Sequence, residues 1–114
     1  PRDGEIDFPE GEFNGNISAF MHWQGGTSGG SQDAYSTGVP MGGNRWHTAV
    51  IEWLPSRCTF ILDGAVIGNS TTTSKIPSTA MHFVIQNGGS FSQTPDNTSQ
   101  GHIYIDWVAV YKPA

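Results

Sequence analysis

The sequence predicts an all-β fold, an antiparallel β-sandwich. Short apolar or alternating runs, separated by Gly, Pro, Asn and Ser, recur from end to end, which is typical of many short strands. The chain has 15 glycines and 7 prolines but only 13% charged residues, and Leu, Lys and Glu, which build long helices, are scarce. A length of 114 residues suits one hydrophobic core, so we expect a single domain, or part of one, over residues 1–114, with about seven strands and no clear helix.

The first two predicted strands lie close to the N-terminus. Glu5 to Glu10 forms the first, residues 11–15 form a turn, and Ile17 to Trp23 forms the second. The segment from Gln24 to Asn44 is dominated by Gly and Ser, so we expect a long loop there that lies on the surface or lines a cleft.

The middle of the chain predicts a strand followed by a hairpin. Trp46 to Leu54 is bounded by an Asn and by Pro-Ser, as strands often are. Thr59–Leu62 and Ala65–Ile67 are joined by Asp63-Gly64, the dipeptide that most readily adopts the two positive φ angles of a type I′ turn.

Two more strands are predicted toward the C-terminus, at Ala80–Gln86 and at His102–Tyr111, where apolar and polar residues alternate. The apolar strands place Trp46, Trp53 and Trp107 in the expected core. Cys58 is the only cysteine, and its apolar neighbours predict a buried, unpaired thiol.

The charge balance excludes several partner classes. Ten acidic and five basic residues give a net charge of -5, so no positive field attracts nucleic acid or anionic lipid. No apolar stretch approaches the roughly 20 residues needed to cross a bilayer. A neutral ligand such as a sugar needs no such field, and we expect no nucleic-acid or membrane partner.

Three acids crowd the first predicted strand, in Glu5-Ile6-Asp7-Phe8-Pro9-Glu10. Like charges on one strand face repel, so the crowding predicts a function. Glu5 and Asp7 share a face of a regular strand, whereas Glu10 points to the other. One bulged residue, which Pro9 makes plausible, brings all three to one face.

Carboxylates gathered in this way suit glycoside hydrolysis. Retaining enzymes need two carboxyl groups about 5–5.5 Å apart, whereas inverting enzymes need about 6.5–9.5 Å. A third carboxylate between them helps to keep the acid protonated while the nucleophile stays ionised. Spacing alone does not assign the roles.

The strand resembles the Glu-x-Asp-x-x-Glu signature of glycoside hydrolase family 16, the laminarinase-like group. The similarity continues in order along the chain, through ISAFMHW (17–23), WHTAVIEW (46–53), FILDG (60–64) and IDWVAVY (105–111). The resemblance implies a jelly-roll, concanavalin A-like sandwich. Because the family's catalytic strand lies near the middle of that domain, this chain is expected to correspond to its C-terminal half.

The resemblance also implies an activity and its residues. Glu5 is the expected nucleophile, Asp7 its electrostatic helper and Glu10 the acid/base of a retaining endo-β-glycanase. β-1,3-Glucan is the leading substrate, while mixed-linkage glucan and galactans such as agar or carrageenan stay open. The resemblance also implies a secreted protein. We expect the chain to self-associate or to pair with a missing N-terminal half, because the unpaired edge of a sheet can pair with another strand.

Three further residues are candidates for substrate binding, each with a structural alternative. His22 can hydrogen-bond the sugar or the acids, or be a half-buried strand histidine. Trp23 can stack on a pyranose ring or belong to the core. Gln86 matches a family cleft position, and its amide suits sugar hydroxyls, but it can also cap a strand end.

No cofactor is expected for catalysis. The family resemblance allows a structural calcium with Asp106 as a ligand. The four histidines show neither the HExxH pattern nor another recognised zinc spacing. The competing function is a non-catalytic carbohydrate-binding sandwich, or an inactive fragment of such an enzyme, because fold alone does not fix function.

Overall fold

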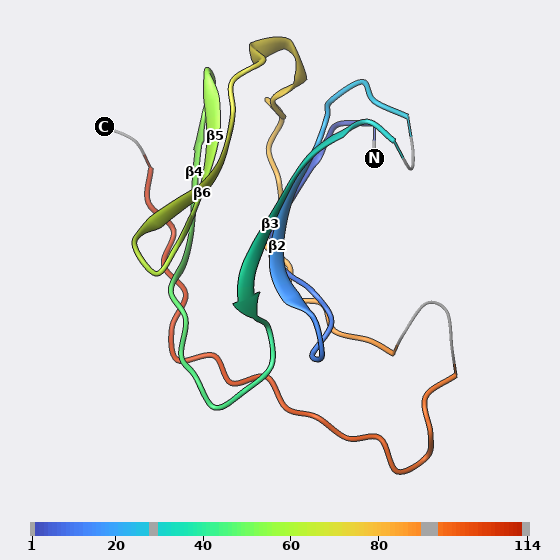
Figure 1. The fold of residues 1–114 in the computed structure, drawn as a ribbon. Helices are drawn as coiled ribbons and strands as arrows, with labels where there is room; N and C mark the ends of the chain where they lie inside the picture. The colour runs from blue at the N-terminus through green and yellow to red at the C-terminus, as the bar shows by residue number, and fades with distance from the viewer. Residues whose placement is uncertain (1, 28–29, 90–93, 113–114) are drawn as a thin grey trace. The chain divides into compact units, whose positions relative to one another are not determined.

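The computed structural model describes residues 2–27, 30–89 and 94–112. Within these residues it contains six strands and one short 3₁₀ helix, arranged as two three-stranded antiparallel sheets (Figure 1). One sheet has the order β1-β2-β3 and the other β4-β5-β6. The elements are β1 (Glu5–Glu10), β2 (Asn16–His22), β3 (Gln32–Pro40), β4 (Ala49–Leu54), β5 (Arg57–Leu62), β6 (Ala65–Ser70) and η1 (Thr73–Lys75). The predicted all-β sandwich is confirmed.

The chain divides into two compact units, Pro1–Met81 and His82–Ala114. All six strands lie in the first unit. No helix of the described residues is long and apolar enough to cross a membrane.

Both sheets contribute to the core of the first unit. Phe60 of β5 is fully buried, and the rings of Phe8 and Tyr35 lie 5.5 and 5.8 Å from it, centroid to centroid. Tyr35 also packs so closely over Gly68 of β6 that a Cβ there would lie 2.2 Å from the tyrosine ring. Its hydroxyl is 3.0 Å from the hydroxyl of the buried Ser70. These contacts from β1 and β3 hold the two sheets together.

Strand β2 shows why one face of its sheet is free for function. Ile17, Ala19 and Met21 alternate along it and are almost fully buried, so they point into the core. The intervening residues, including Phe20 and His22, are only half-buried and point the other way. We call this side of the β1-β2-β3 sheet, turned away from the core, the carboxylate face.

The predicted hairpin is present. Asp63 and Gly64 have φ angles of 51° and 83°, as a type I′ turn requires. The Asp63 side chain accepts a hydrogen bond from the backbone N–H of Thr48, 2.8 Å away, and lies 2.7 Å from His47 Nδ1. The turn is thereby tied to the residues that precede β4.

The predicted loop from Gln24 to Asn44 is wrong over its second half, because it contains β3. Gln32–Pro40 pairs with β2 along most of its length and alternates half-buried with exposed residues. Its weak strand propensity is overridden by backbone pairing with β2 and by the packing of Tyr35 on the core.

The prediction of core tryptophans is also wrong. Trp46 and Trp107 are 70% and 65% exposed, and Trp53 is 37% exposed. Strand β4 begins at Ala49 rather than Trp46, and among the described strands it pairs with β5 alone, at the edge of its sheet. The core is instead filled from β2 and β5, and the Trp53 indole N–H donates to the Pro77 carbonyl at 2.7 Å.

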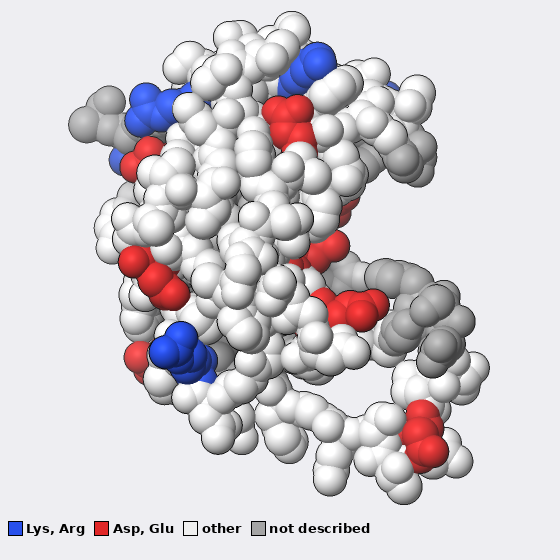
Figure 2. All heavy atoms as spheres, in the orientation of Figure 1, with Lys and Arg blue, Asp and Glu red and all other residues white. Residues whose placement is uncertain are grey.

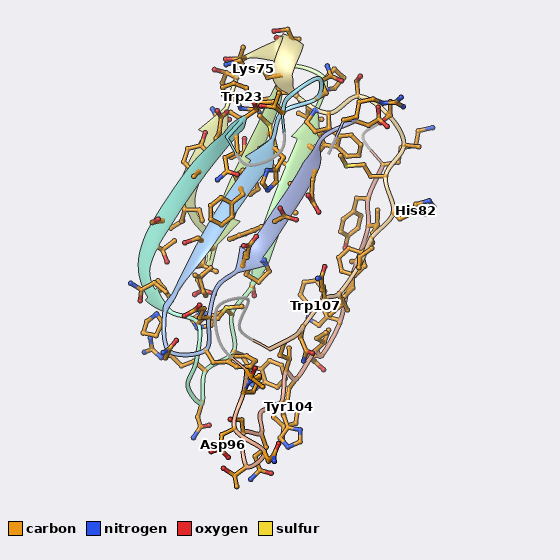
Figure 3. The ribbon with its side chains drawn as sticks, turned by 90° about the vertical axis from the view of Figure 1, so that its right-hand side faces the viewer. Trp23, Lys75, His82, Asp96, Tyr104 and Trp107 are labelled. Atoms are coloured by element: carbon orange, nitrogen blue, oxygen red, sulfur yellow. The ribbon has the colours of Figure 1, made fainter. Side chains whose placement is uncertain are left out.

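The two strands predicted near the C-terminus are not formed. Residues 80–89 and 94–112 contain no strand, although Tyr104 and Trp107 lie in an alternating sequence (Figure 3). A strand needs a hydrogen-bonded neighbour, and the described residues there pair with no other segment in a ladder. Alternation of apolar and polar residues indicates a preference for strand, but a strand also needs a neighbouring strand with which to form hydrogen bonds.

Cys58 is the buried, unpaired thiol that was expected. Desolvation, with a smaller contribution from the negative charge of Asp33, raises the pKa of its thiol to about 12. The thiolate is therefore suppressed, and Cys58 behaves as a small apolar core residue.

Candidate functional site

The site is built on a β-bulge in β1. Glu5 lies opposite His22, and Asp7 lies opposite Phe20, in regular antiparallel register. The next pair joins Glu10 to the residue two positions before Phe20, so β1 advances three residues while β2 advances two. One extra residue is therefore accommodated between Asp7 and Glu10, as predicted.

The bulge places the third acid on the same face as the other two. Glu10 is paired with Ser18, which shares the carboxylate face with Phe20 and His22. Directly opposed residues of an antiparallel pair project from the same face. Glu10 therefore joins Glu5 and Asp7, whereas an unbulged strand would turn it toward the core.

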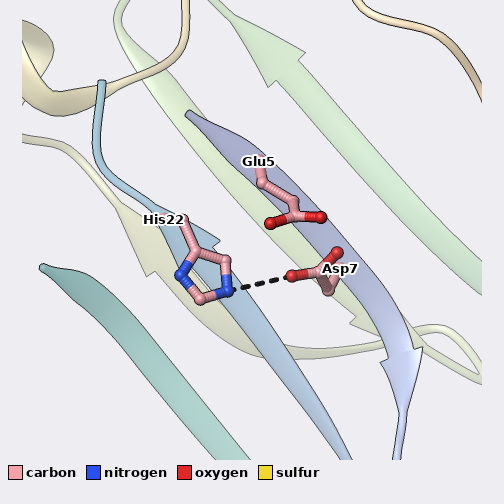
Figure 4. Close-up of side chains that lie close together, drawn as sticks. All are labelled: Glu5, Asp7 and His22. Atoms are coloured by element: carbon pink, nitrogen blue, oxygen red, sulfur yellow. Dashed lines mark ion pairs between the residues drawn. The ribbon is translucent and has the colours of Figure 1, made fainter. Parts of the chain in front are cut away.

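Asp7 and His22 form an ion pair across the two strands. His22 Nε2 lies 3.0 Å from Asp7 Oδ2, and Glu5 lies next to them on the same face (Figure 4). The two side chains are 25% and 27% exposed, so solvent and small ligands reach them. His22 thus contacts the carboxylate cluster, one of the options that the sequence left open, and it is also a half-buried strand residue; its role in substrate binding stays a prediction.

The electrostatics of the cluster converge on Asp7. Desolvation is the largest influence, and together with the negative charges of Glu5 and Glu10 it raises the pKa of the Asp7 carboxyl from 3.8 to about 6. The charge and hydrogen bond of His22 act in the opposite direction but do not cancel the rise. The negative charges of both glutamates thus raise the pKa of the aspartate that lies between them in β1.

The same three residues resemble a metal site. Glu5, Asp7 and His22 each offer one ligand atom, and these atoms all lie within 4.8 Å of one another. Across residues 2–27, 30–89 and 94–112, this is the one such group of three. Asp106 belongs to no such group, so the calcium expectation gains no support from its surroundings and stays a prediction.

Sequence reasoning missed Phe20. It lies opposite Asp7, and its ring stacks with that of His22 at 6.4 Å between centroids and 23° between planes. On β3, Ala34 lies opposite Phe20 and is too small to cover it. The signal was in the sequence, because Phe20 and His22 are two residues apart and share a face of any strand.

Sequence reasoning also missed Gln32, for a different reason. It lies opposite His22 on β3, and therefore also belongs to the carboxylate face. Its segment was expected to be loop, so no face could be assigned to it.

Trp23 lies apart from the carboxylate face. Its side chain packs against the core cluster, and its indole N–H donates to Asp33 at 2.9 Å. The Lys75 ammonium lies 3.3 Å from the centroid of the indole ring, as a cation–π contact (Figure 3). The structure thus places one ring face of Trp23 under a lysine, and a role in substrate binding stays a prediction.

Gln86 lies in the second unit and is exposed. The strand that it was expected to end is not formed. Its predicted role in substrate binding likewise stays a prediction.

Charge is sparse on the molecular surface. The face drawn in Figure 2 shows acidic and basic side chains in small separate patches, with uncharged atoms between them. This agrees with the low charged fraction of 13%. The three acids of β1 give the site its local negative charge.

Comparison with known proteins identifies a family for these features. The model of glycosyl hydrolases family 16 matches residues 1–109, nearly the whole chain. Searches of curated proteins and of solved structures find no match. The chain therefore belongs to glycosyl hydrolase family 16.

Proposed function

We propose that this family 16 member is a retaining endo-β-glycanase, in which Glu5, Asp7 and Glu10 carry the reaction. The observation that carries the proposal is the bulge in β1, because it gathers all three carboxylates on one face. Membership of a glycoside hydrolase family supports hydrolysis as the reaction class.

The proposed reaction has two steps. Glu10 donates a proton to the glycosidic oxygen as the bond to the anomeric carbon breaks, and Glu5 forms a covalent glycosyl ester at that carbon. Glu10, now ionised, removes a proton from water, which attacks the anomeric carbon and releases the sugar and the Glu5 carboxylate. Each residue thereby returns to its starting protonation state.

Asp7 is the proposed electrostatic helper. Its pKa of about 6 means that a proton on the cluster is held partly by the middle carboxylate near neutral pH. The ion pair with His22 fixes its orientation at 3.0 Å. Asp7 can therefore share a proton with the nucleophile and release it when Glu5 becomes an ester and loses its charge.

The substrate proposed first is β-1,3-glucan, in keeping with the laminarinase-like resemblance. A pyranose ring has an apolar face, and the half-buried Phe20 offers a matching surface opposite Asp7. Gln32 on the neighbouring strand supplies an amide suited to sugar hydroxyls. Mixed-linkage glucans and galactans remain alternative polymers for the same chemistry.

We also propose that the chain corresponds to the C-terminal half of a jelly-roll domain of a secreted enzyme. Strand β1 has a neighbour on one side only among the strands of the described residues. Its other edge suits pairing with an N-terminal half or with a second copy. Light scattering tests whether this edge pairs with a second copy, and a monodisperse monomer would count against such self-association.

A non-catalytic carbohydrate-binding sandwich is the second candidate. The half-buried position of the site and the stacked rings of Phe20 and His22 favour sugar contact whether or not hydrolysis follows. The crowded acids favour catalysis, because a binding module gains little from them.

The deciding experiment incubates the chain with laminarin, mixed-linkage glucan and galactans, and follows new reducing ends beside Glu5→Gln and Glu10→Gln variants. The proposal predicts release that both substitutions abolish. Unchanged release in Glu5→Gln would contradict the assigned nucleophile. Binding of a polymer without release by the wild type would favour the carbohydrate-binding module.

A further inference from the structure

The carboxylate face combines two kinds of metal-ligand atom. Glu5 and Asp7 offer carboxylate oxygens from β1, and His22 offers an imidazole nitrogen from β2, with all three atoms within 4.8 Å. In zinc sites, bonds of about 2.0–2.2 Å place neighbouring ligand atoms roughly 3.4 Å apart. Only small side-chain adjustments therefore separate the present arrangement from a three-ligand site.

We propose that Glu5, Asp7 and His22 bind a divalent transition-metal ion, with Zn²⁺ as the representative ion. Imidazole together with carboxylate suits Zn²⁺, whereas Ca²⁺ and Mg²⁺ take oxygen ligands and more of them. Three protein ligands leave a fourth position for water. The two carboxylates balance the charge of the ion.

The site is accessible to an ion, and binding replaces the existing contact between His22 and Asp7. Asp7 and His22 are 27% and 25% exposed, and Glu5 is exposed, so no rearrangement of the fold is needed for entry. On binding, the 3.0 Å contact between His22 Nε2 and Asp7 Oδ2 gives way to bonds from each atom to the metal.

The position of the site gives binding a consequence, which rests on the proposed function. Metal bonds occupy the oxygen lone pairs with which Glu5 would attack the anomeric carbon. They also withdraw the middle carboxylate from proton exchange. Zn²⁺ therefore acts as an inhibitor that competes with substrate at the carboxylates.

The chain contains a matched control. His47 and Asp63 form a second histidine–aspartate pair, with Nδ1 2.7 Å from Oδ2. Neither belongs to a group of three ligand-bearing side chains within the described part of the chain. Two ligands bind a metal much more weakly than three, so this pair reports what a histidine–aspartate contact achieves without the third residue.

The test is a calorimetric titration of the chain with Zn²⁺ and, separately, with Ca²⁺. We expect one Zn²⁺ per chain, with an affinity reduced at least about tenfold in His22→Gln and in Glu5→Gln, about 1.4 kcal/mol or more. His47→Gln should bind like the wild type, and Ca²⁺ should bind much more weakly. Circular dichroism of each variant checks that the fold is kept.

Three results would overturn the proposal. Undiminished Zn²⁺ binding by folded His22→Gln, an equal loss in His47→Gln, or Ca²⁺ binding as tight as that of Zn²⁺ would each contradict it.

Inhibition is measured separately, as reducing-end release from laminarin with and without Zn²⁺ at concentrations that the titration shows to be saturating. Undiminished release would contradict the inhibitory role but leave the metal site intact. Binding by a chain that hydrolyses no polymer would support the metal site and count against the proposed function alone.

Discussion

Two histidine–aspartate pairs of similar geometry lie in the first unit, and the pKa values of their aspartates are shifted in opposite directions. Asp7 and His22 are 3.0 Å apart, and Asp63 and His47 are 2.7 Å apart. The pKa of Asp7 is raised to about 6, whereas the pKa of Asp63 is lowered. The contact with histidine therefore does not decide how the aspartate behaves.

The neighbours of each pair decide it. Asp7 is partly desolvated between two other carboxylates, Glu5 and Glu10, and both effects favour its neutral form. Asp63 lies in an exposed turn, where hydrogen bonds from His47 and from the Thr48 backbone N–H favour its ionised form. One aspartate lies within a cluster of carboxylates, and the other lies in a hairpin turn, where it contacts His47 and Thr48.

The largest expected difference between the pairs concerns turnover. Asp7→Asn should lower kcat on polysaccharide by about 10²–10³-fold, a loss typical for one preorganised electrostatic group. Asp63→Asn should leave kcat within about twofold, because it changes only the hairpin. Initial rates on laminarin measure both, and equal losses in the two variants would break the comparison.

The pairs should also differ in how pH affects stability. Between about pH 4 and pH 6 the folded chain holds a proton on Asp7 that the unfolded chain has lost, so this carboxyl makes stability fall as pH rises. Asp63, with its lowered pKa, contributes stability above its usual value of 3.8, and this is lost as pH falls through the lowered pKa.

Thermal melts from pH 3 to pH 7 would measure these opposite slopes. Relative to the wild type, Asp7→Asn should gain stability as pH rises, and Asp63→Asn should gain stability toward the acid end. Slopes of the same sign in both variants would contradict the opposite pKa shifts.

Removal of each histidine should have a smaller effect. His47→Ala should lower the free energy of unfolding only slightly, because exposed histidine–carboxylate contacts contribute little, and it should leave Asp7 unaffected. His22→Ala should raise the pKa of Asp7 further, because His22 opposes its rise. Urea unfolding and NMR titration measure the two effects, and a fall in the Asp7 pKa in His22→Ala would refute this account.

A small effect on stability is also expected for an electrostatic contact outside both pairs. Lys75→Ala removes the ammonium that lies 3.3 Å from the centroid of the Trp23 ring. A cation–π contact near the surface contributes about 0.5–1 kcal/mol, so the free energy of unfolding should fall by that amount. Lys75→Arg serves as the control, because it keeps the positive charge. A fall of several kcal/mol in the free energy of unfolding would mean that Lys75 contributes more than this one contact.

Much of the site could be predicted because its signals are local. The acids Glu5, Asp7 and Glu10 lie within six residues, and their parity together with Pro9 indicated the bulge. Asp63-Gly64 indicated its turn for the same reason, since the two φ angles depend on those residues alone.

The errors arose where structure depends on a distant partner. Strand β3 is formed by pairing with β2, in spite of its polar composition, so Gln32 was missed as a site residue. The opposite error was made at His102–Tyr111, where the sequence resembles a strand but pairs with no neighbour in the described residues. The mixed-ligand cluster was also hidden, because its three residues match no recognised metal-ligand spacing and His22 reaches Asp7 across a strand pair.

The most direct test of the central claim is an NMR titration that follows the side-chain carboxyl carbons of Asp7 and Asp63 in one series of spectra. The account predicts that Asp7 titrates near pH 6 and Asp63 below its ordinary value, with the Asp7 midpoint falling in Glu5→Gln. Coincident midpoints for the two aspartates, or an Asp7 midpoint unmoved by Glu5→Gln, would contradict it.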